Sequence, residues 1–217
     1  MSDSLVDRLR RLDACALSDT MDRLKLPSAV TGLAARSVRK RIAGRVRTVK
    51  LEAANGRTAA HHLCTTAIEA ADAGDVIVVE QRSGIDAAGW GGILSMGALT
   101  KGVSGVIVEG PARDIDEAVD FGFPVYSRSA TARTARGRII EVATGGPVTV
   151  GEVTVADGDY VLADSSGVVF IPAAELERVV GEAEQIVARE AAMAKAAKEG
   201  KPMSQVMGAN YEQMLKN

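Results

Sequence analysis

Three short, mostly apolar segments alternate with two helical segments in the middle of the chain, and this alternation constrains the fold most strongly. The expected strands are residues 75–80 (DVIVVE), 103–108 (VSGVIV) and 123–127 (FPVYS). Glycines lead into an expected helix at 91–101, and another helix begins at Asp114. Strand–helix–strand–helix–strand order at this spacing predicts parallel strands with right-handed crossovers, and therefore an α/β fold.

The segments before and after this unit complete the expected architecture. On the N-terminal side, the patterns predict a helix at 4–15, a short helix capped by Ser18 and closed by Pro27, a strand at 43–53 and an Ala-rich helix at 57–73. After Arg138 the chain becomes β-rich, with the segments IIEVA, PVTVGEVTV, YVLAD and GVVFI separated by turn residues. A long helix is expected at 173–198, and a short one around 203–215. Because there is no repeat or linker, we expect a single domain over residues 1–217 with a C-terminal helical arm, 173–217, that packs on a neighbouring subunit.

Composition and charge exclude several classes of protein. The net charge is −2, which argues against general nucleic-acid binding. One basic cluster, between Arg36 and Lys50, is either a solvated strand face or subunit contact, or an anion-attracting patch. No apolar stretch approaches the length of a membrane span, and the N-terminus lacks a signal-peptide pattern, so we expect a cytoplasmic protein without a membrane partner. Cys15 and Cys64 fit neither a zinc site nor a disulfide framework.

The segment from Gly110 to Glu117 (GPARDIDE) carries the strongest chemical signal. It lies where a buried parallel strand ends and a helix begins, the place where ligands gather in α/β proteins. Arg113 can bind a carboxylate with two parallel hydrogen bonds, and Asp114 offers oxygen ligands suited to Mg²⁺ or Mn²⁺. The alternative is structural, because Asp114 followed by Glu117 is also a capping arrangement for the helix.

The segment from Gly89 to Ser95 (GWGGILS) is a second candidate. Glycines that lead into a helix leave free N–H groups, which favour a bound anion. Close packing is the alternative explanation for these glycines. His61 and His62 are adjacent on the expected helix at 57–73, about 100° apart, so they cannot both face one metal.

Together these segments resemble the RraA-like family, which includes 4-hydroxy-4-methyl-2-oxoglutarate/4-carboxy-4-hydroxy-2-oxoadipate aldolases and the regulator of ribonuclease E activity A. The resemblance lies in WGGILSMGALTKGVSGVIVEGPARDIDEAV, in LSDTMDRLKLP and in HHLCTTAIEAADAGDVIVVE, and it spans a core of roughly residues 15–172. It implies a layered α/β sandwich with a central parallel βαβ unit. It also implies homotrimers or homohexamers with active sites between subunits.

The resemblance also assigns roles to individual residues. Asp114 matches the metal ligand and Arg113 the substrate-binding arginine, and both are expected to be catalytic. The loop of Gly91, Gly92, Ile93 and Leu94 matches the segment that holds the substrate carboxylate. One departure matters: the aldolases carry Asp-x20-Arg-Asp, and Gly92 stands at the first position of that motif here. Asp86 and Glu80 are nearby candidates for the missing carboxylate.

The function implied by the resemblance is that of a metal-dependent lyase that cleaves a carbon–carbon bond of a 2-oxo acid through a metal-stabilised enolate. Aldol cleavage and oxaloacetate decarboxylation share this enolate. Since only aldol cleavage needs a base, the Gly at position 92 favours decarboxylation or an altered substrate. The alternative is a non-catalytic, protein-binding regulator like the ribonuclease E inhibitor, which would need no metal. Mg²⁺-dependent release of pyruvate from a 2-oxo acid would discriminate between them.

Overall fold

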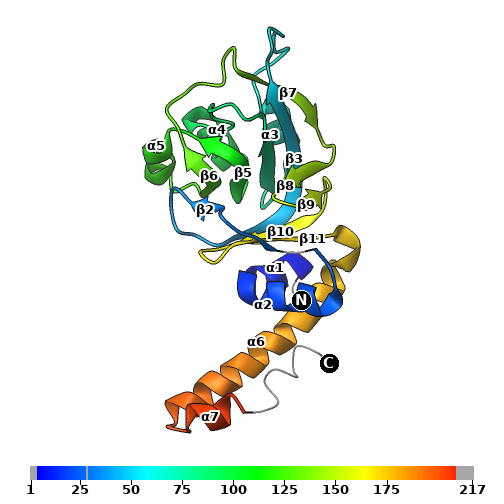
Figure 1. The fold of residues 1–217 in the computed structure, drawn as a ribbon, viewed down its shortest axis with the longest axis vertical. Coiled ribbons are helices and arrows are strands. Elements are labelled where there is room, and N and C mark those ends of the chain that lie inside the picture. Colours follow the sequence, from blue (N-terminus) through cyan, green and yellow to red (C-terminus); the bar gives the residue numbers. More distant parts are fainter. Residues whose placement is uncertain (1–3, 28, 209–217) are drawn as a thin grey trace.

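The computed structural model describes residues 4–27 and 29–208 (Figure 1). Its elements in chain order are α1 (Leu5–Arg11), α2 (Ala14–Leu24), β1 (Ala29–Val30), β2 (Ala34–Ala35), β3 (Ile42–Ala53), α3 (Thr65–Ala70), β4 (Val76–Gln81), α4 (Gly92–Thr100), β5 (Gly105–Ala112), α5 (Ile115–Asp120), β6 (Val125–Ala130), β7 (Ile139–Thr144), β8 (Val148–Val150), β9 (Val153–Val155), β10 (Tyr160–Ala163), β11 (Val168–Ile171), the 3₁₀ turn η1 (Ala173–Glu175), α6 (Leu176–Lys198) and α7 (Met203–Val206).

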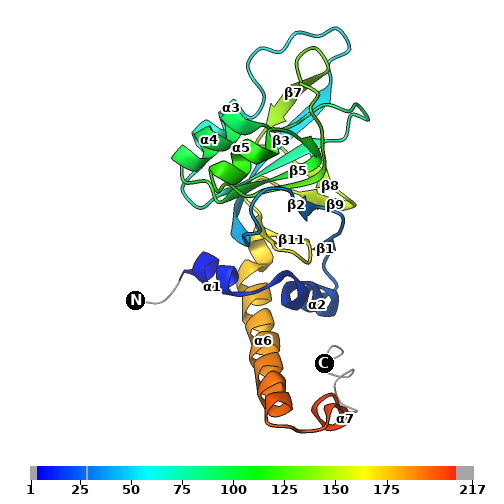
Figure 2. The same ribbon diagram turned by 90° about the vertical axis from the view of Figure 1, so that its left-hand side faces the viewer.

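The predicted parallel unit is present and includes one strand more than the sequence suggested. β3, β4, β5 and β6 are hydrogen-bonded side by side and all run parallel. Successive residues of β4 serve two cores: Ile77 and Val79 pack under α3, α4 and α5, whereas Val76 and Val78 pack on the opposite face. Burial on both faces explains why this strand is apolar without interruption. Figure 2 shows the three helices together on one face of the sheet.

The β-rich second half closes the other side of the sheet, so the expected α/β sandwich with a central parallel unit is confirmed. The strand order is β1-β11-β10-β3-β4-β5-β6-β2, and β7 pairs with the far end of β3. The long strand β3 bonds to β10 through its first residues and to β7 through its last ones, with a register shift between Lys50 and Leu51. The β8–β9 hairpin packs against the face opposite the three helices. The sheet consequently curls (Figure 1).

The C-terminal arm projects away from the sheet (Figure 1). The first turns of α6 bury Leu176, Val179 and Val180 against α1 and α2, and the last turns are largely exposed. The helix expected at 173–198 is thus confirmed as η1 followed by α6. Of the segment expected around 203–215, α7 is helical, and residues 209–217 lie outside the described residues. Within residues 4–27 and 29–208, no helix combines the length and apolar character needed to cross a membrane.

Two of the predicted N-terminal helix boundaries are wrong. The helix expected at 4–15 ends at Arg11, and the second helix begins at Ala14 rather than after Ser18. Asp13 is the actual cap, since its side chain accepts a hydrogen bond from the Ala16 amide at 2.9 Å. The apolar spacing continues across this break, which is why the pattern alone concealed it.

The prediction of a helix over residues 57–73 is also wrong, because only α3 (Thr65–Ala70) is helical within this range. Cys64, which precedes it, has a left-handed backbone (φ 66°), and its amide donates to the Glu141 carboxylate at 2.5 Å. Glu141 lies on β7, far along the chain, so a tertiary contact overrides the local helix preference of the alanines. His61 and His62 therefore lie on a loop, not on a helix.

Candidate active site

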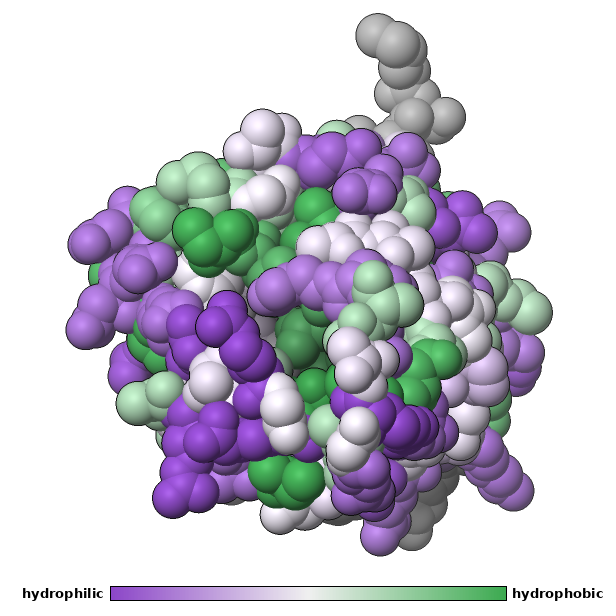
Figure 3. Space-filling model, turned by 90° about the horizontal axis from the view of Figure 1, so that it is seen from above, coloured by the Kyte–Doolittle hydropathy of each residue, from purple (hydrophilic) through white to green (hydrophobic). Residues whose placement is uncertain are grey.

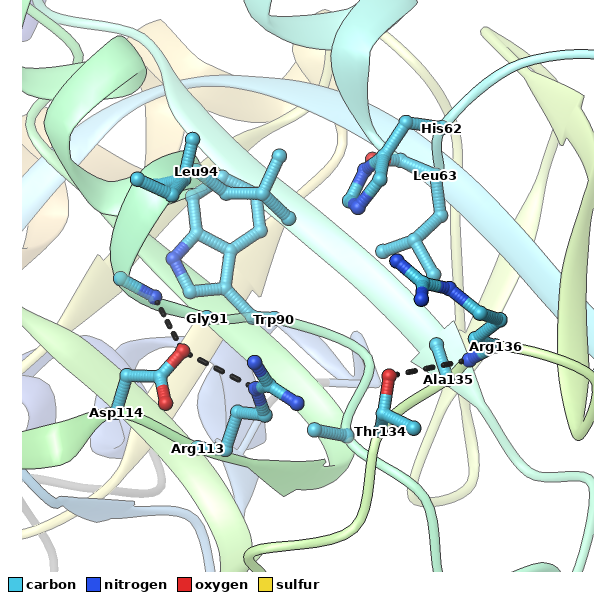
Figure 4. Close-up of a pocket in the computed structure, with 13 residues that line it drawn as sticks. His62, Leu63, Trp90, Gly91, Leu94, Arg113, Asp114, Thr134, Ala135 and Arg136 are labelled. Carbon is cyan, nitrogen blue, oxygen red and sulfur yellow. Dashed lines mark hydrogen bonds and ion pairs between the residues drawn. The ribbon is translucent and has the colours of Figure 1, made fainter.

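The C-terminal edge of the parallel strands brings the two predicted site segments together. The Arg113 amide, just after β5, donates to the Trp90 carbonyl at 3.0 Å, and the Gly89 amide donates to the Pro111 carbonyl at 2.9 Å. The segment that leads into α4 therefore runs along the end of β5. Arg113 and Asp114 face the loop of residues 91–94, as the sequence predicts (Figure 4).

Asp114 does not cap its own helix. Its backbone is left-handed (φ 55°), a conformation that Asp tolerates better than most residues, and its side chain forms no capping hydrogen bond to α5. One carboxylate oxygen, Oδ2, instead accepts from the Gly92 amide at 3.0 Å and from the Arg113 Nε at 3.1 Å. The capping alternative is wrong for α5, since the carboxylate is aimed at the N-terminus of α4.

The N-terminus of α4 is open to a ligand. Gly91 precedes the helix in an extended conformation, and a Cβ there would lie 2.8 Å from the Asp114 Oδ2, so a larger residue would displace the carboxylate. The Gly92 amide is taken by Asp114, but the amides of Ile93 and Leu94 have no acceptor among the described residues. Free amides at the start of a helix favour a carboxylate.

Glu117 is the site residue that the sequence reasoning treated only as a capping partner. A Cβ on Gly92 would overlap the Glu117 Oε2 and would lie 3.2 Å from the Asp114 Cβ. The Glu117 carboxylate thus occupies the space of the side chain missing at position 92. Its i+3 spacing from Asp114 at the start of α5 was the available signal, since such residues share a helix face.

The two carboxylates proposed from the sequence for this role lie elsewhere. The Glu80 carboxylate accepts from the Thr149 amide at 2.7 Å, on the opposite side of the sheet. Asp86 forms an exposed ion pair with Arg133 at 3.4 Å. The atoms nearest to the Cβ position at Gly92 belong to Glu117 and Asp114 and not to either of these residues, so both suggestions are wrong.

A cavity of 160 Å³ opens beside these groups. Its buried side includes the Trp90 indole, which donates from Nε1 to the Ser95 Oγ at 2.9 Å and stacks on Phe123 at 6.3 Å. The opposite wall comes from two loops that contribute His62 and the residues 134–136 (Figure 4). The view from above faces the end of the molecule where β3 to β6 terminate, and it shows hydrophobic residues in hollows between hydrophilic ones (Figure 3).

The loop that carries His62 is tied to the site by Cys64. The buried thiol donates to the Gly89 carbonyl at 3.6 Å. Burial, and then the nearby Glu141 carboxylate, raise the pKa of the Cys64 thiol well above its ordinary value, so the thiol stays neutral. His61 contacts Glu141 at 3.1 Å, which leaves His62 as the histidine of the cavity wall. Cys64 therefore positions the loop and has no character of a nucleophile.

Comparison with known proteins shows which family this chain belongs to. The family model for RraA-like proteins, described as Aldolase/RraA, matches residues 14–170. The chain belongs to the RraA-like family. The 4-hydroxy-4-methyl-2-oxoglutarate aldolase of Thermus thermophilus is 32% identical over 138 residues, which cover 62% of this RraA-like chain and 77% of that protein. Protein DlpA of Legionella pneumophila is 26% identical over 182 residues, and this chain spans only 30% of the length of DlpA.

Solved structures of similar proteins share the fold. An uncharacterized protein from Pseudomonas syringae pv. tomato superposes with a TM-score of 0.85 at 27% identity, covering 96% of this RraA-like chain and 98% of that one. RraAS2 of Streptomyces coelicolor, described as an unusual member of the RNase ES inhibitor RraA protein family, superposes with a TM-score of 0.78 at 25% identity, over 88% and 95% of the two chains. Relatives of this chain thus carry both aldolase and inhibitor names.

Proposed function

We propose that this RraA-like chain is a divalent-metal-dependent carbon–carbon lyase, an aldolase or decarboxylase that acts on pyruvate-type 2-oxo acids. The observation that carries the proposal is a pair of carboxylates, Asp114 and Glu117, at Gly92, with the Arg113 guanidinium beside them. The name of the T. thermophilus relative supports the lyase class. The direct test is release of pyruvate from oxaloacetate and from a 4-hydroxy-2-oxo diacid, with Mg²⁺ and with a chelator.

Asp114 and Glu117 are the residues that would hold the ion. Mg²⁺ and Mn²⁺ prefer carboxylate oxygens, and Mg²⁺ usually binds through one or two carboxylates while keeping several waters. The described residues hold no group of three or more His, Cys, Asp or Glu side chains arranged for a metal, so the proposal rests on two carboxylates completed by water. A bound ion would polarise the keto oxygen of the substrate and stabilise the negative charge that develops there.

Arg113 and α4 would orient the substrate. The Arg113 Nε is committed to Asp114, and the rest of the guanidinium faces the cavity (Figure 4). It can therefore neutralise the oxygen that becomes the enolate when the carbon–carbon bond breaks. The free amides of Ile93 and Leu94 would receive the substrate carboxylate at the helix N-terminus.

The presence or absence of a base at Glu117 decides whether this site can catalyse aldol cleavage as well as decarboxylation. Loss of CO₂ from oxaloacetate needs no base, whereas retro-aldol cleavage needs a group that takes the proton of the substrate hydroxyl. Glu117 occupies the space of the side chain missing at Gly92, the position at which the resemblance implies an aspartate in the aldolases. We propose that Glu117 replaces that aspartate, both at the metal and as proton acceptor, so that decarboxylation and aldol cleavage are both open to this chain.

Replacing Glu117 with Gln is expected to lower kcat/KM for aldol cleavage about a hundredfold, the lower end of what general-base catalysis contributes. Adding Gly92→Asp to a Glu117→Ala variant should restore part of the loss, because the new carboxylate would enter the vacated space. Pyruvate release measures both variants, and Asp116→Asn on the exposed side of α5 is the control. Full activity of Glu117→Gln would contradict this role.

We further propose that the chain assembles as a homotrimer or homohexamer with sites between subunits. Large apolar side chains are exposed on α4 and α5 beside the cavity, and Ile93, at 85% exposure, is the clearest case. A subunit interface would cover them. Light scattering is expected to give a mass of three or six chains of 22.6 kDa, and a single-chain mass at micromolar concentration would contradict the proposal.

A regulatory function is the second candidate, supported by the similarity to the inhibitor family of S. coelicolor RraAS2. A regulator of this kind would bind a protein partner through its surface and would need no metal. If neither oxaloacetate nor a 4-hydroxy-2-oxo diacid yields pyruvate with any divalent ion, the regulatory function becomes the better explanation.

A further inference from the structure

The cavity at Arg113 and Asp114 is adjoined by a second, larger one of 370 Å³. The same five residues, His62, Leu63 and 134–136, line both cavities. The first is the smaller, at 160 Å³, and holds the groups proposed to bind the 2-oxo acid end. The second continues away from Asp114, between the loop before α3 and the loop before β7, and it offers space for a longer carbon chain.

Arg136 stands where the two cavities meet, across from Asp114. In Figure 4 its guanidinium extends into the pocket beside His62. Two local hydrogen bonds hold its loop: the Arg136 amide donates to the Thr134 side-chain Oγ1 at 3.3 Å, and the Arg138 amide donates to the Ala135 carbonyl at 2.8 Å. These bonds fix the backbone of the turn that carries the Arg136 side chain.

The guanidinium of Arg136 differs from those of its neighbours because the described residues provide it with no hydrogen-bond acceptor and no carboxylate. Arg57 pairs with Glu52 at 3.1 Å, and Arg133 pairs with Asp86 at 3.4 Å. Arg138 donates to the Thr134 carbonyl at 3.1 Å. Arg136 is itself exposed, at the rim that the two cavities share, and a guanidinium there with its donors uncommitted matches the planar geometry of a carboxylate.

We propose that Arg136 binds a second carboxylate of the substrate, remote from the 2-oxo acid group, and so selects dicarboxylic over monocarboxylic 2-oxo acids. The proposal rests on the proposed lyase function, in which Arg113 and the α4 amides take the first carboxylate. Arg136 touches no reacting atom in this arrangement. It is a specificity-determining residue, whose loss should weaken binding of the diacid and leave the bond-breaking step intact.

The test compares two unreactive probes by calorimetry in the presence of Mg²⁺. Oxalate is short and would occupy only the first cavity, whereas 2-oxoglutarate also carries a remote carboxylate. Arg136→Gln is expected to weaken 2-oxoglutarate binding about tenfold to a hundredfold, the range for a lost charge-assisted hydrogen bond, and oxalate binding less than about twofold. In a 4-hydroxy-2-oxo diacid assay, KM should rise while kcat changes little.

Arg133→Gln is the matched control, since Arg133 lies three positions away, is exposed like Arg136 and lines neither cavity. It should leave the binding of both probes unchanged. Equal weakening of both probes by Arg136→Gln, or no weakening of either, would overturn the role of Arg136 while leaving the lyase function in place. A wild-type protein that neither binds oxalate nor releases pyruvate would instead overturn the lyase function, and this proposal with it.

Discussion

Asp114→Asn is expected to lower metal-dependent pyruvate release by about a thousandfold, because it removes a charged ligand worth several kcal/mol of charge stabilisation. Asn keeps an oxygen that can accept from the Gly92 amide, so the N-terminus of α4 keeps its hydrogen bond. Asp114→Ala removes that bond as well, and should cost about 1 kcal/mol of stability in addition. The two variants together separate catalysis from capping.

The measurements are pyruvate release, Mg²⁺ or Mn²⁺ binding by calorimetry, and thermal unfolding. Metal binding should be lost in both Asp114 variants, and the folded state should persist. Asp116→Asn, two positions along on an exposed part of α5, should behave as wild type. If Asp114→Ala only lowers the melting temperature while metal-dependent turnover continues, Asp114 is a structural residue and the site assignment is wrong.

Arg113→Lys is expected to lower kcat/KM about a hundredfold or more, in spite of the conserved charge, because it removes a donor aimed at developing charge. The guanidinium has to serve two partners, since its Nε donates to Asp114 while its remaining nitrogens face the cavity. The single ammonium group of lysine cannot donate to both partners in this planar arrangement.

The Arg113 variant is distinguished from the Asp114 variants by its effect on the metal. Arg113→Lys should retain metal binding and lose affinity for oxalate, whereas Asp114→Asn should lose metal binding. Arg133→Lys, at an exposed ion pair outside both cavities, is the matched control and should keep full activity. Normal oxalate binding and turnover in Arg113→Lys would show that the guanidinium is not needed at this site.

The sequence alone predicted the parallel unit and the position of Arg113 and Asp114 at the end of a strand. Both predictions depend on local patterns: an uninterrupted apolar run such as residues 76–79 marks a strand buried on both faces, and glycine or aspartate at its end marks a turn into a helix. The resemblance to the RraA-like family came from the same segment. Local periodicity is informative there because each element is short and regular.

Only the tertiary structure decided which partners the polar groups find. The Glu141 carboxylate accepts a hydrogen bond from the Cys64 amide, and the helix expected at 57–73 begins only after this residue, at Thr65. The Asp114 carboxylate accepts a hydrogen bond from the Gly92 amide instead of capping its own helix. The side chain of Glu117 lies in the space that a side chain at Gly92 would occupy. These contacts join residues between 22 and 77 positions apart, or depend on the absence of a side chain. Periodicity describes the neighbours of a residue along one element, whereas the partner of a carboxylate is set by how separate elements pack.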